Sequence, residues 1–110
     1  MLRSTIRMLI SPEKQGEALA ILASVSEQAQ YEPGCLSCRL YRGMDDPRAI
    51  LLEELWQNDE DLQCHLRSVK YRQVLLVIEM SVEPPEIRFD VIAHSSGVEV
   101  IEKARIKITG

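Results

Sequence analysis

Apolar residues follow two different periods along this chain. Four segments alternate apolar and polar residues, as half-buried strands do: 2–10, 35–42, 49–56 and 86–93. Two others, from about residue 12 to 31 and from 59 to 80, space their apolar residues three and four apart, which predicts amphipathic helices. The order β-α-β-β-α-β is that of the ferredoxin-like split β-α-β fold, an α+β antiparallel sheet with helices on one face.

Turn and capping residues divide these elements. Pro33 and Gly34 end the first helix, and Asn58 is suited to cap the second. The second helical pattern runs for more than twenty residues, which is long for a small domain, so we expect a break near Ser68.

The end of the chain fits either a strand or a helix. The segment Ser96–Glu99 matches a capping box, which favours a short helix at about 97–105. We therefore expect one domain at 1–94 and an extension of the same domain at 95–110.

One face of the predicted sheet has no helix to cover it. Leu36, Leu40, Leu51 and Leu55 are expected there. An exposed apolar face of that size predicts a partner, and a second copy of the chain is the simplest one. We therefore expect a homodimer that forms through the sheet faces.

Composition excludes several classes of function. The 110 residues carry a net charge of −4, and the pI near 5.2 disfavours nucleic acid as a partner. No apolar run approaches the ~20 residues of a membrane helix, and the first residues do not resemble a signal peptide. Three cysteines, an odd number, favour a reducing compartment, which predicts a cytoplasmic protein that binds neither nucleic acid nor membrane.

Several short motifs occur in a distinctive order. Pro33-Gly34 precedes the second strand, Glu54 and Trp56 end the third, and His65 follows within the next helix. From residue 1 to about 94 the chain resembles the antibiotic biosynthesis monooxygenase (ABM) domain. The resemblance implies a homodimer in which two sheets form one α+β barrel, with a cavity between each sheet and its own helices. It also implies cofactor-independent oxidation of phenolic or quinol-like compounds in some members, whereas other members are isomerases or degrade haem.

His65 is the strongest candidate for proton transfer. It lies three residues after Leu62 and four before Val69, so it faces the apolar side of its helix. Histidine is the side chain whose ordinary pKa suits proton transfer near neutral pH. The alternative is a core histidine bonded to the backbone.

Glu54 and Trp56 share one face of their strand because they are two residues apart. A carboxylate facing the helices is costly unless it is paired, so a Glu54–His65 pair is plausible. The alternative is that Trp56 fills the core while Glu54 forms a structural ion pair.

Tyr71 and Tyr41 are candidates for binding a substrate through their hydroxyl groups, although tyrosines that border a sheet more often serve packing, with the hydroxyl in water. Cys35 and Cys38 have the C-x-x-C spacing, but on a strand they should point to opposite faces, which excludes a disulfide. No metal site is predicted, because the sequence has no second C-x-x-C pair to complete a zinc site. No bound cofactor is predicted, and the lack of dinucleotide and P-loop fingerprints fits a cofactor-free enzyme.

Three functions remain open. The first is a cofactor-independent monooxygenase in which His65 takes the proton of a small phenol or quinol that then reacts with dioxygen. The second is haem binding or degradation with His65 as axial ligand. Haem-degrading relatives carry an asparagine on the first strand, and residues 2–10 contain none. The third is a dimer that binds a small molecule without catalysis.

Overall fold

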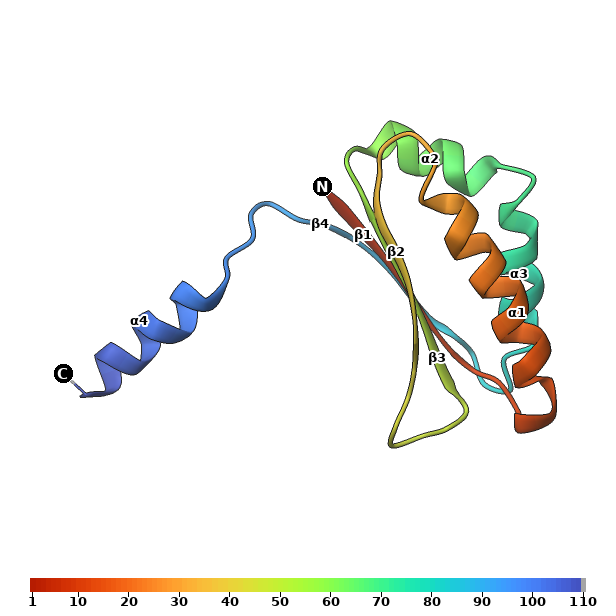
Figure 1. Ribbon diagram of the computed structural model, residues 1–110, viewed down its shortest axis with the longest axis horizontal. Helices are drawn as coiled ribbons and strands as arrows, with labels where there is room; N and C mark the ends of the chain where they lie inside the picture. Colours follow the sequence, from red (N-terminus) through yellow and green to blue (C-terminus); the bar gives the residue numbers. More distant parts are fainter. Residues whose placement is uncertain (110) are drawn as a thin grey trace.

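The computed structural model describes the backbone of residues 1–109 and the side chains of residues 1–106 (Figure 1). Eight elements follow one another along the chain: β1 (Leu2–Leu9), α1 (Pro12–Ala29), β2 (Cys35–Arg42), β3 (Ala49–Trp56), α2 (Asp59–Arg67), α3 (Tyr71–Glu79), β4 (Glu86–Val91) and α4 (Val98–Thr109). The predicted order of strands and helices is confirmed as far as β4.

The four strands form a single antiparallel sheet in the order β2-β3-β1-β4. The strand β3 therefore lies between β1 and β2, the two strands that α1 connects. This is the split β-α-β arrangement, and the predicted α+β fold is confirmed. Figure 1 shows α1, α2 and α3 on one side of the sheet, with the other side uncovered by them.

The core lies between the sheet and these helices. Alternate residues of β1 and β3, such as Ile6, Met8, Ile50 and Leu52, point at α1 and α3 and are almost completely buried. Leu22 of α1 meets them from the other layer. Burying a side chain of this size contributes about 1.5–3 kcal/mol, so this layer fixes the register of β3 and with it the side on which Glu54 and Trp56 lie.

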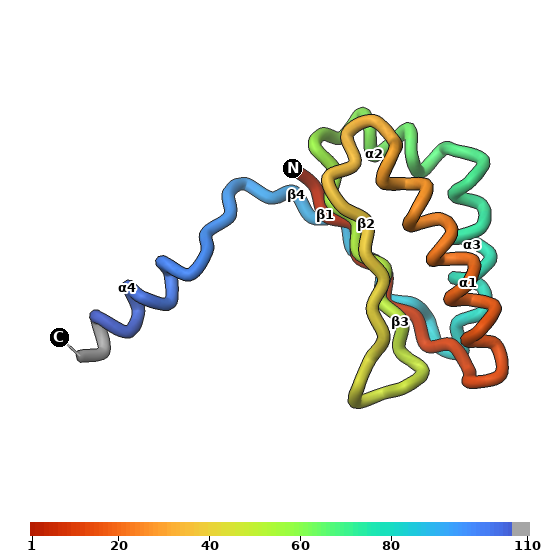
Figure 2. The backbone as a smooth tube through the Cα atoms, in the orientation of Figure 1, coloured from red at the N-terminus to blue at the C-terminus, as the bar shows by residue number. Residues whose placement is uncertain are grey.

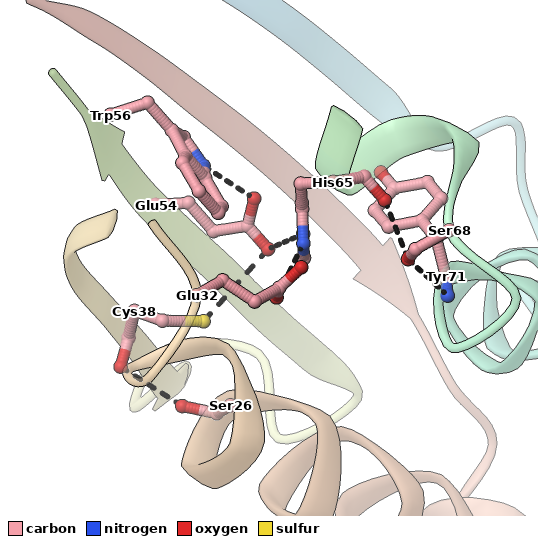
Figure 3. Close-up of polar contacts among 8 residues, drawn as sticks. All are labelled: Ser26, Glu32, Cys38, Glu54, Trp56, His65, Ser68 and Tyr71. Atoms are coloured by element: carbon pink, nitrogen blue, oxygen red, sulfur yellow. Dashed lines mark hydrogen bonds and ion pairs between the residues drawn. The ribbon is translucent and has the colours of Figure 1, made fainter. Parts of the chain in front are cut away.

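The helical segment after β3 breaks where expected. The helix α2 ends at Arg67, Ser68 is extended at its C-cap, and α3 begins at Tyr71. The Ser68 hydroxyl donates to the His65 carbonyl at 2.7 Å and accepts from the Tyr71 amide at 3.3 Å, which joins the two helices (Figure 3). Val69 falls in the break and is exposed, whereas His65 remains buried.

A β-bulge in β2 corrects two of the expectations. Cys35 pairs with Trp56 and Cys38 pairs with Glu54, with the register shift between residues 35 and 37. One extra residue reverses the alternation, so both cysteines lie on the helix-covered face instead of opposite faces. All three cysteines, Cys35, Cys38 and Cys64, are free thiols. The same register places Leu40 opposite Leu52 and against the core, so the prediction that Leu40 lies on the uncovered face is wrong.

The helix α4 extends away from the rest of the chain. Figures 1 and 2 show it beyond β4, on the side of the sheet that α1, α2 and α3 leave uncovered. It is a helix, as favoured by the capping box, and it continues to Thr109, beyond the expected end near residue 105. Val98, Val100 and Ile101 are exposed on it. The predicted extension also includes residue 110, which lies outside the described residues.

None of the helices within residues 1–109 combines the length and the hydropathy needed to cross a bilayer.

Candidate functional site

A buried polar cluster lies where β3 ends beneath α2. Strand alternation carries Glu54 and Trp56 to the helix-covered face, where Trp56 is fully buried and Glu54 is 1 % exposed. His65 comes from α2, and it is 2 % exposed because helical spacing turns it toward the sheet beside Leu62. The structure therefore brings together all three residues predicted as catalytic (Figure 3).

Glu54 and His65 are in direct contact. The Nε2 atom of His65 lies 3.1 Å from Oε2 of Glu54, and the indole ring of Trp56 packs on the imidazole with the ring centroids 4.6 Å apart. Tyr71 of α3 meets the imidazole in a T-shaped arrangement, with a centroid separation of 5.1 Å and an interplanar angle of 74°. The two aromatic rings and the carboxylate together fix the position and plane of the imidazole.

Three donors surround the Glu54 carboxylate. Trp56 donates its Nε1–H to Oε1 at 3.1 Å, and the Cys38 thiol lies 3.8 Å from Oε2 on the side away from Trp56. His65 Nε2 supplies the third contact. A carboxylate is an acceptor only, so this arrangement suits the ionised form and offsets the cost of burying it. It also requires His65 to carry a proton on Nε2.

A second carboxylate occupies the other side of the imidazole. Oε2 of Glu32 lies 2.8 Å from His65 Nδ1, and the Glu32 side chain is 25 % exposed. Glu32 is not among the predicted site residues, because it comes directly before the Pro33-Gly34 turn that ends the first helix. It lies 33 residues from His65 in the chain, and no local pattern connects the two.

The turn that carries Glu32 is attached to the start of α2. Gly34 has φ +79°, a conformation that favours glycine, and a Cβ atom there would collide with the Asp61 side chain. The Gly34 carbonyl accepts from the Gln57 amide at 2.8 Å. Asn58 caps α2 by accepting from the Asp61 amide at 2.9 Å. The Pro33-Gly34 motif thus holds Glu32 next to the helix that carries His65.

The environment shifts the pKa of His65 upward. Burial alone would lower the pKa of this imidazole, but hydrogen bonds to Glu54 and Glu32 and their negative charges outweigh it. The two carboxylates thus favour the protonated form of the imidazole, which becomes a base when it has lost the proton on Nδ1.

The neighbouring groups are held in their neutral forms. Burial, followed by the charge of Glu54, raises the pKa of the Cys38 thiol to about 12 and raises that of the Tyr71 hydroxyl as well. Burial and the charges of Glu54 and Glu32 also raise the pKa of Cys35. These thiols are weak nucleophiles because little thiolate forms. His65 and its two carboxylates are the groups here suited to proton transfer.

Tyr41 lies apart from this cluster. It pairs with Leu51 on the uncovered face and lines a pocket of about 190 Å³ with Arg7 and Ala49. A second pocket, of about 340 Å³, lies along β2 and is lined by Gln30 and residues 35–39. Cys38 belongs both to this pocket and to the cluster around Glu54.

Within residues 1–109 no group of three or more histidine, cysteine or acidic side chains is arranged to hold a metal ion. An enclosed imidazole between two carboxylates, as in this cluster, is suited to acid–base chemistry.

Solved structures share this fold. A crystal structure of an antibiotic biosynthesis monooxygenase matches with a TM-score of 0.76 and 22 % identity, over 86 % of this chain and all of that one. A Mycobacterium tuberculosis protein gives a TM-score of 0.78 at 21 % identity, over 87 % and 98 % of the two chains. At these identities the likeness shows the fold alone.

Sequence comparison adds the family. A protein of Synechocystis sp. PCC 6803, described as uncharacterised, is 26 % identical over 87 residues, which is 78 % of this chain and 59 % of that protein's length. The family model for antibiotic biosynthesis monooxygenase matches residues 1–85, which include the whole cluster of Glu32, Glu54, Trp56 and His65. The chain therefore belongs to the antibiotic biosynthesis monooxygenase (ABM) family.

Proposed function

We propose that this protein is a cofactor-independent monooxygenase acting on a small phenol or quinol, with His65 as the proton acceptor. The observation that carries the proposal is a buried imidazole fixed at Nε2 by the Glu54 carboxylate, 3.1 Å away. A carboxylate in this position orients the imidazole and stabilises the imidazolium that forms on proton transfer. Trp56 completes the site by donating to Glu54 and packing on the imidazole.

The reaction needs no external reductant. Loss of the phenolic proton to His65 gives a phenolate, which passes one electron to dioxygen. The radical pair combines to form a C–O bond, and the peroxide anion takes back the proton that His65 accepted. The resulting hydroperoxide loses water to give a quinone. One oxygen atom enters the product and the other leaves as water, so the four electrons that the substrate loses equal those that dioxygen gains.

The surroundings of the imidazole favour the first of these steps. Trp56 and Tyr71 are buried and exclude water from two sides of the ring, which strengthens the attraction between the phenolate and the imidazolium. We assign Tyr71 to the wall of the substrate site. Tyr41 has no part in this proposal because it lies on the uncovered face.

The haem alternative gains no support from the first strand. The residue of β1 that pairs with Glu54 is Ser4, which is buried on the helix-covered face. Haem-degrading relatives have an asparagine on this strand. The non-catalytic alternative keeps the same cluster as structure and differs only in the absence of turnover.

We further propose a homodimer in a reducing compartment, the cytoplasm. The uncovered face presents Leu51 and Leu55, both half-buried, beside exposed Tyr41, and Leu36 is exposed at the bulge of β2. A second copy would cover these side chains, and α4 extends on the same side of the sheet, where it can reach a partner (Figure 1). The three free thiols fit a reducing location.

Replacing His65 with Gln tests the proposal. The amide keeps much of the volume and a hydrogen bond but cannot accept the proton, so turnover should fall ~10²–10⁴-fold while the protein stays folded. The measurement is oxygen uptake and quinone formation over a panel of phenols and hydroquinones. The matched control is His94→Gln, which changes the other, exposed histidine. Full activity in a folded His65→Gln variant would remove His65 from catalysis, and no turnover of any substrate by the wild type would favour the non-catalytic alternative.

A further inference from the structure

The two carboxylates that contact His65 are held very differently. Glu54 is 1 % exposed, lies on an inner strand of the sheet and has three donors around it. Glu32 lies in a turn, its side chain is 25 % exposed, and His65 Nδ1 is its one side-chain partner among the contacts of the described residues. Moving Glu54 would leave three buried donors without an acceptor, whereas moving Glu32 would release only Nδ1.

We propose that Glu32 occupies the position at which the ionisable oxygen of a ligand binds Nδ1 of His65. In the absence of ligand its carboxylate takes the place of that oxygen. When a ligand binds, Glu32 leaves toward solvent and the ligand's oxygen takes over the contact. The site would then select small molecules with an acidic hydroxyl or a carboxyl group, which bind as the anion.

The geometry shows which ring atom takes part in this exchange and which ligands it favours. Because Glu54 holds the proton on Nε2, Nδ1 is the ring atom that can take or return a proton. Any other anionic oxygen at 2.8 Å from Nδ1 would keep the same charge pattern, with an imidazolium between two anions. An ether or an alcohol of the same shape would leave the imidazolium short of one anion and would bind less well.

The groups that face the imidazole are few. Glu32 comes from the turn after α1, Glu54 from β3 and Tyr71 from α3, and Cys38 of β2 contacts the Glu54 carboxylate rather than the ring. The pKa values of the Cys38 and Tyr71 side chains are both raised, so these two groups stay neutral through the range in which His65 titrates. A change in the His65 titration on replacing Glu32 is therefore assignable to Glu32.

The test is chemical rescue, and it needs neither dioxygen nor turnover. The protein is labelled with ¹⁵N-histidine, and the titration of His65 is followed by NMR in the wild type, in Glu32→Ala and in Glu32→Gln. Both variants remove the negative charge, so the midpoint of the His65 titration should move to lower pH by roughly one pH unit. Sodium formate should restore the midpoint in Glu32→Ala, where the vacated space admits it. Formate should leave Glu32→Gln unchanged, because the amide fills that space.

A coloured ligand tests selection directly. 4-Nitrophenol becomes yellow when it ionises, and 4-nitroanisole has the same shape without an ionisable oxygen. Glu32→Ala should bind 4-nitrophenol as the yellow phenolate about 10-fold more tightly than the wild type, because the competing carboxylate is gone; that corresponds to 1.4 kcal/mol. Glu27→Ala, which removes an exposed acid of α1, is the control and should bind as the wild type does.

Three results would overturn the inference. They are an unchanged His65 midpoint in folded Glu32→Ala, a lowered midpoint that formate fails to restore, and equal gains for nitrophenol and nitroanisole. These outcomes are separate from those of the oxygenase test. Loss of oxygenase activity would leave an anion site at Nδ1, and failure of the rescue would leave His65 as a base.

Discussion

Glu53 and Glu54 are neighbours in β3 with opposite surroundings. Glu53 lies on the uncovered face, half-buried, opposite Arg39 on one side and Thr5 on the other. Glu54 lies on the helix-covered face, where Trp56, Cys38 and His65 surround it. The residue type and the strand are the same, and only the direction of the side chain differs.

The comparison shows what turns an ordinary carboxylate into part of a site. Strand alternation decides which glutamate faces the helices, and the buried alternation from Ile50 to Trp56 fixes that choice. A solvated carboxylate on a sheet face affects stability little, because water satisfies it. A buried one must be met by donors, and those donors also fix the imidazole beside it.

Replacing each glutamate with alanine should therefore have very different effects. Glu54→Ala leaves the Trp56 and His65 donors buried without an acceptor and should lower the free energy of unfolding by about 3 kcal/mol. Glu53→Ala should change it by at most about 0.5 kcal/mol. Urea unfolding of both variants measures the difference. Equal decreases in the free energy of unfolding would show that the difference in burial between Glu53 and Glu54 does not affect their contributions to stability.

A charge placed on the uncovered face of the sheet should weaken the proposed dimer. Leu51→Asp places a carboxylate in the predicted contact between the sheets and should weaken dimerisation about 100-fold, or roughly 2.8 kcal/mol. Sedimentation velocity over a dilution series gives the dissociation constants. The control is Leu75→Asp, at an exposed position of α3 on the helical side.

A wild-type monomer at micromolar concentration would exclude the dimer proposal, and so would equal weakening by the two aspartates. A chain that ends at residue 94 extends the test to α4. If α4 contacts a partner, this shortened chain should dissociate at a higher concentration than the full chain.

The fold and the centre of the site were predictable because they depend on the regular spacing of apolar residues, which differs between strands and helices. Alternation identified all four strands, and helical spacing turned His65 inward. The same two periods brought Glu54, Trp56 and His65 together, as the structure has them.

The wrong or missing predictions concern features that do not follow from the regular spacing of apolar residues. The bulge after Cys35 adds one residue to β2, and that single residue moved Cys38 and Leu40 to the face opposite the expected one. The contact between Glu32 and His65 joins a turn to a helix 33 residues away, and it depends on how the Pro33-Gly34 turn meets α2. Such contacts follow from the packing of elements rather than from the pattern within any one of them.

The smallest expected effect is the dependence of stability on pH. The pKa of His65 is raised in the folded protein by Glu54 and Glu32 against the opposing effect of burial, so protonation favours the folded state. This contribution is fully present below the unfolded pKa of about 6.5 and is lost as the pH rises through the folded pKa. The free energy of unfolding should therefore decrease with rising pH across this window.

His65→Gln removes the titrating group. It should therefore remove the part of the pH dependence of the free energy of unfolding that comes from His65. His94→Gln should keep the wild-type slope, because His94 is exposed and lies outside the cluster around His65. Urea unfolding at several pH values between about 6 and 9 measures all three proteins around the ordinary histidine pKa. A slope that survives in His65→Gln would mean that the two carboxylates on the helix-covered face do not hold a protonated imidazole between them. Glu54 would then differ from Glu53 in burial but not in its coupling to a proton.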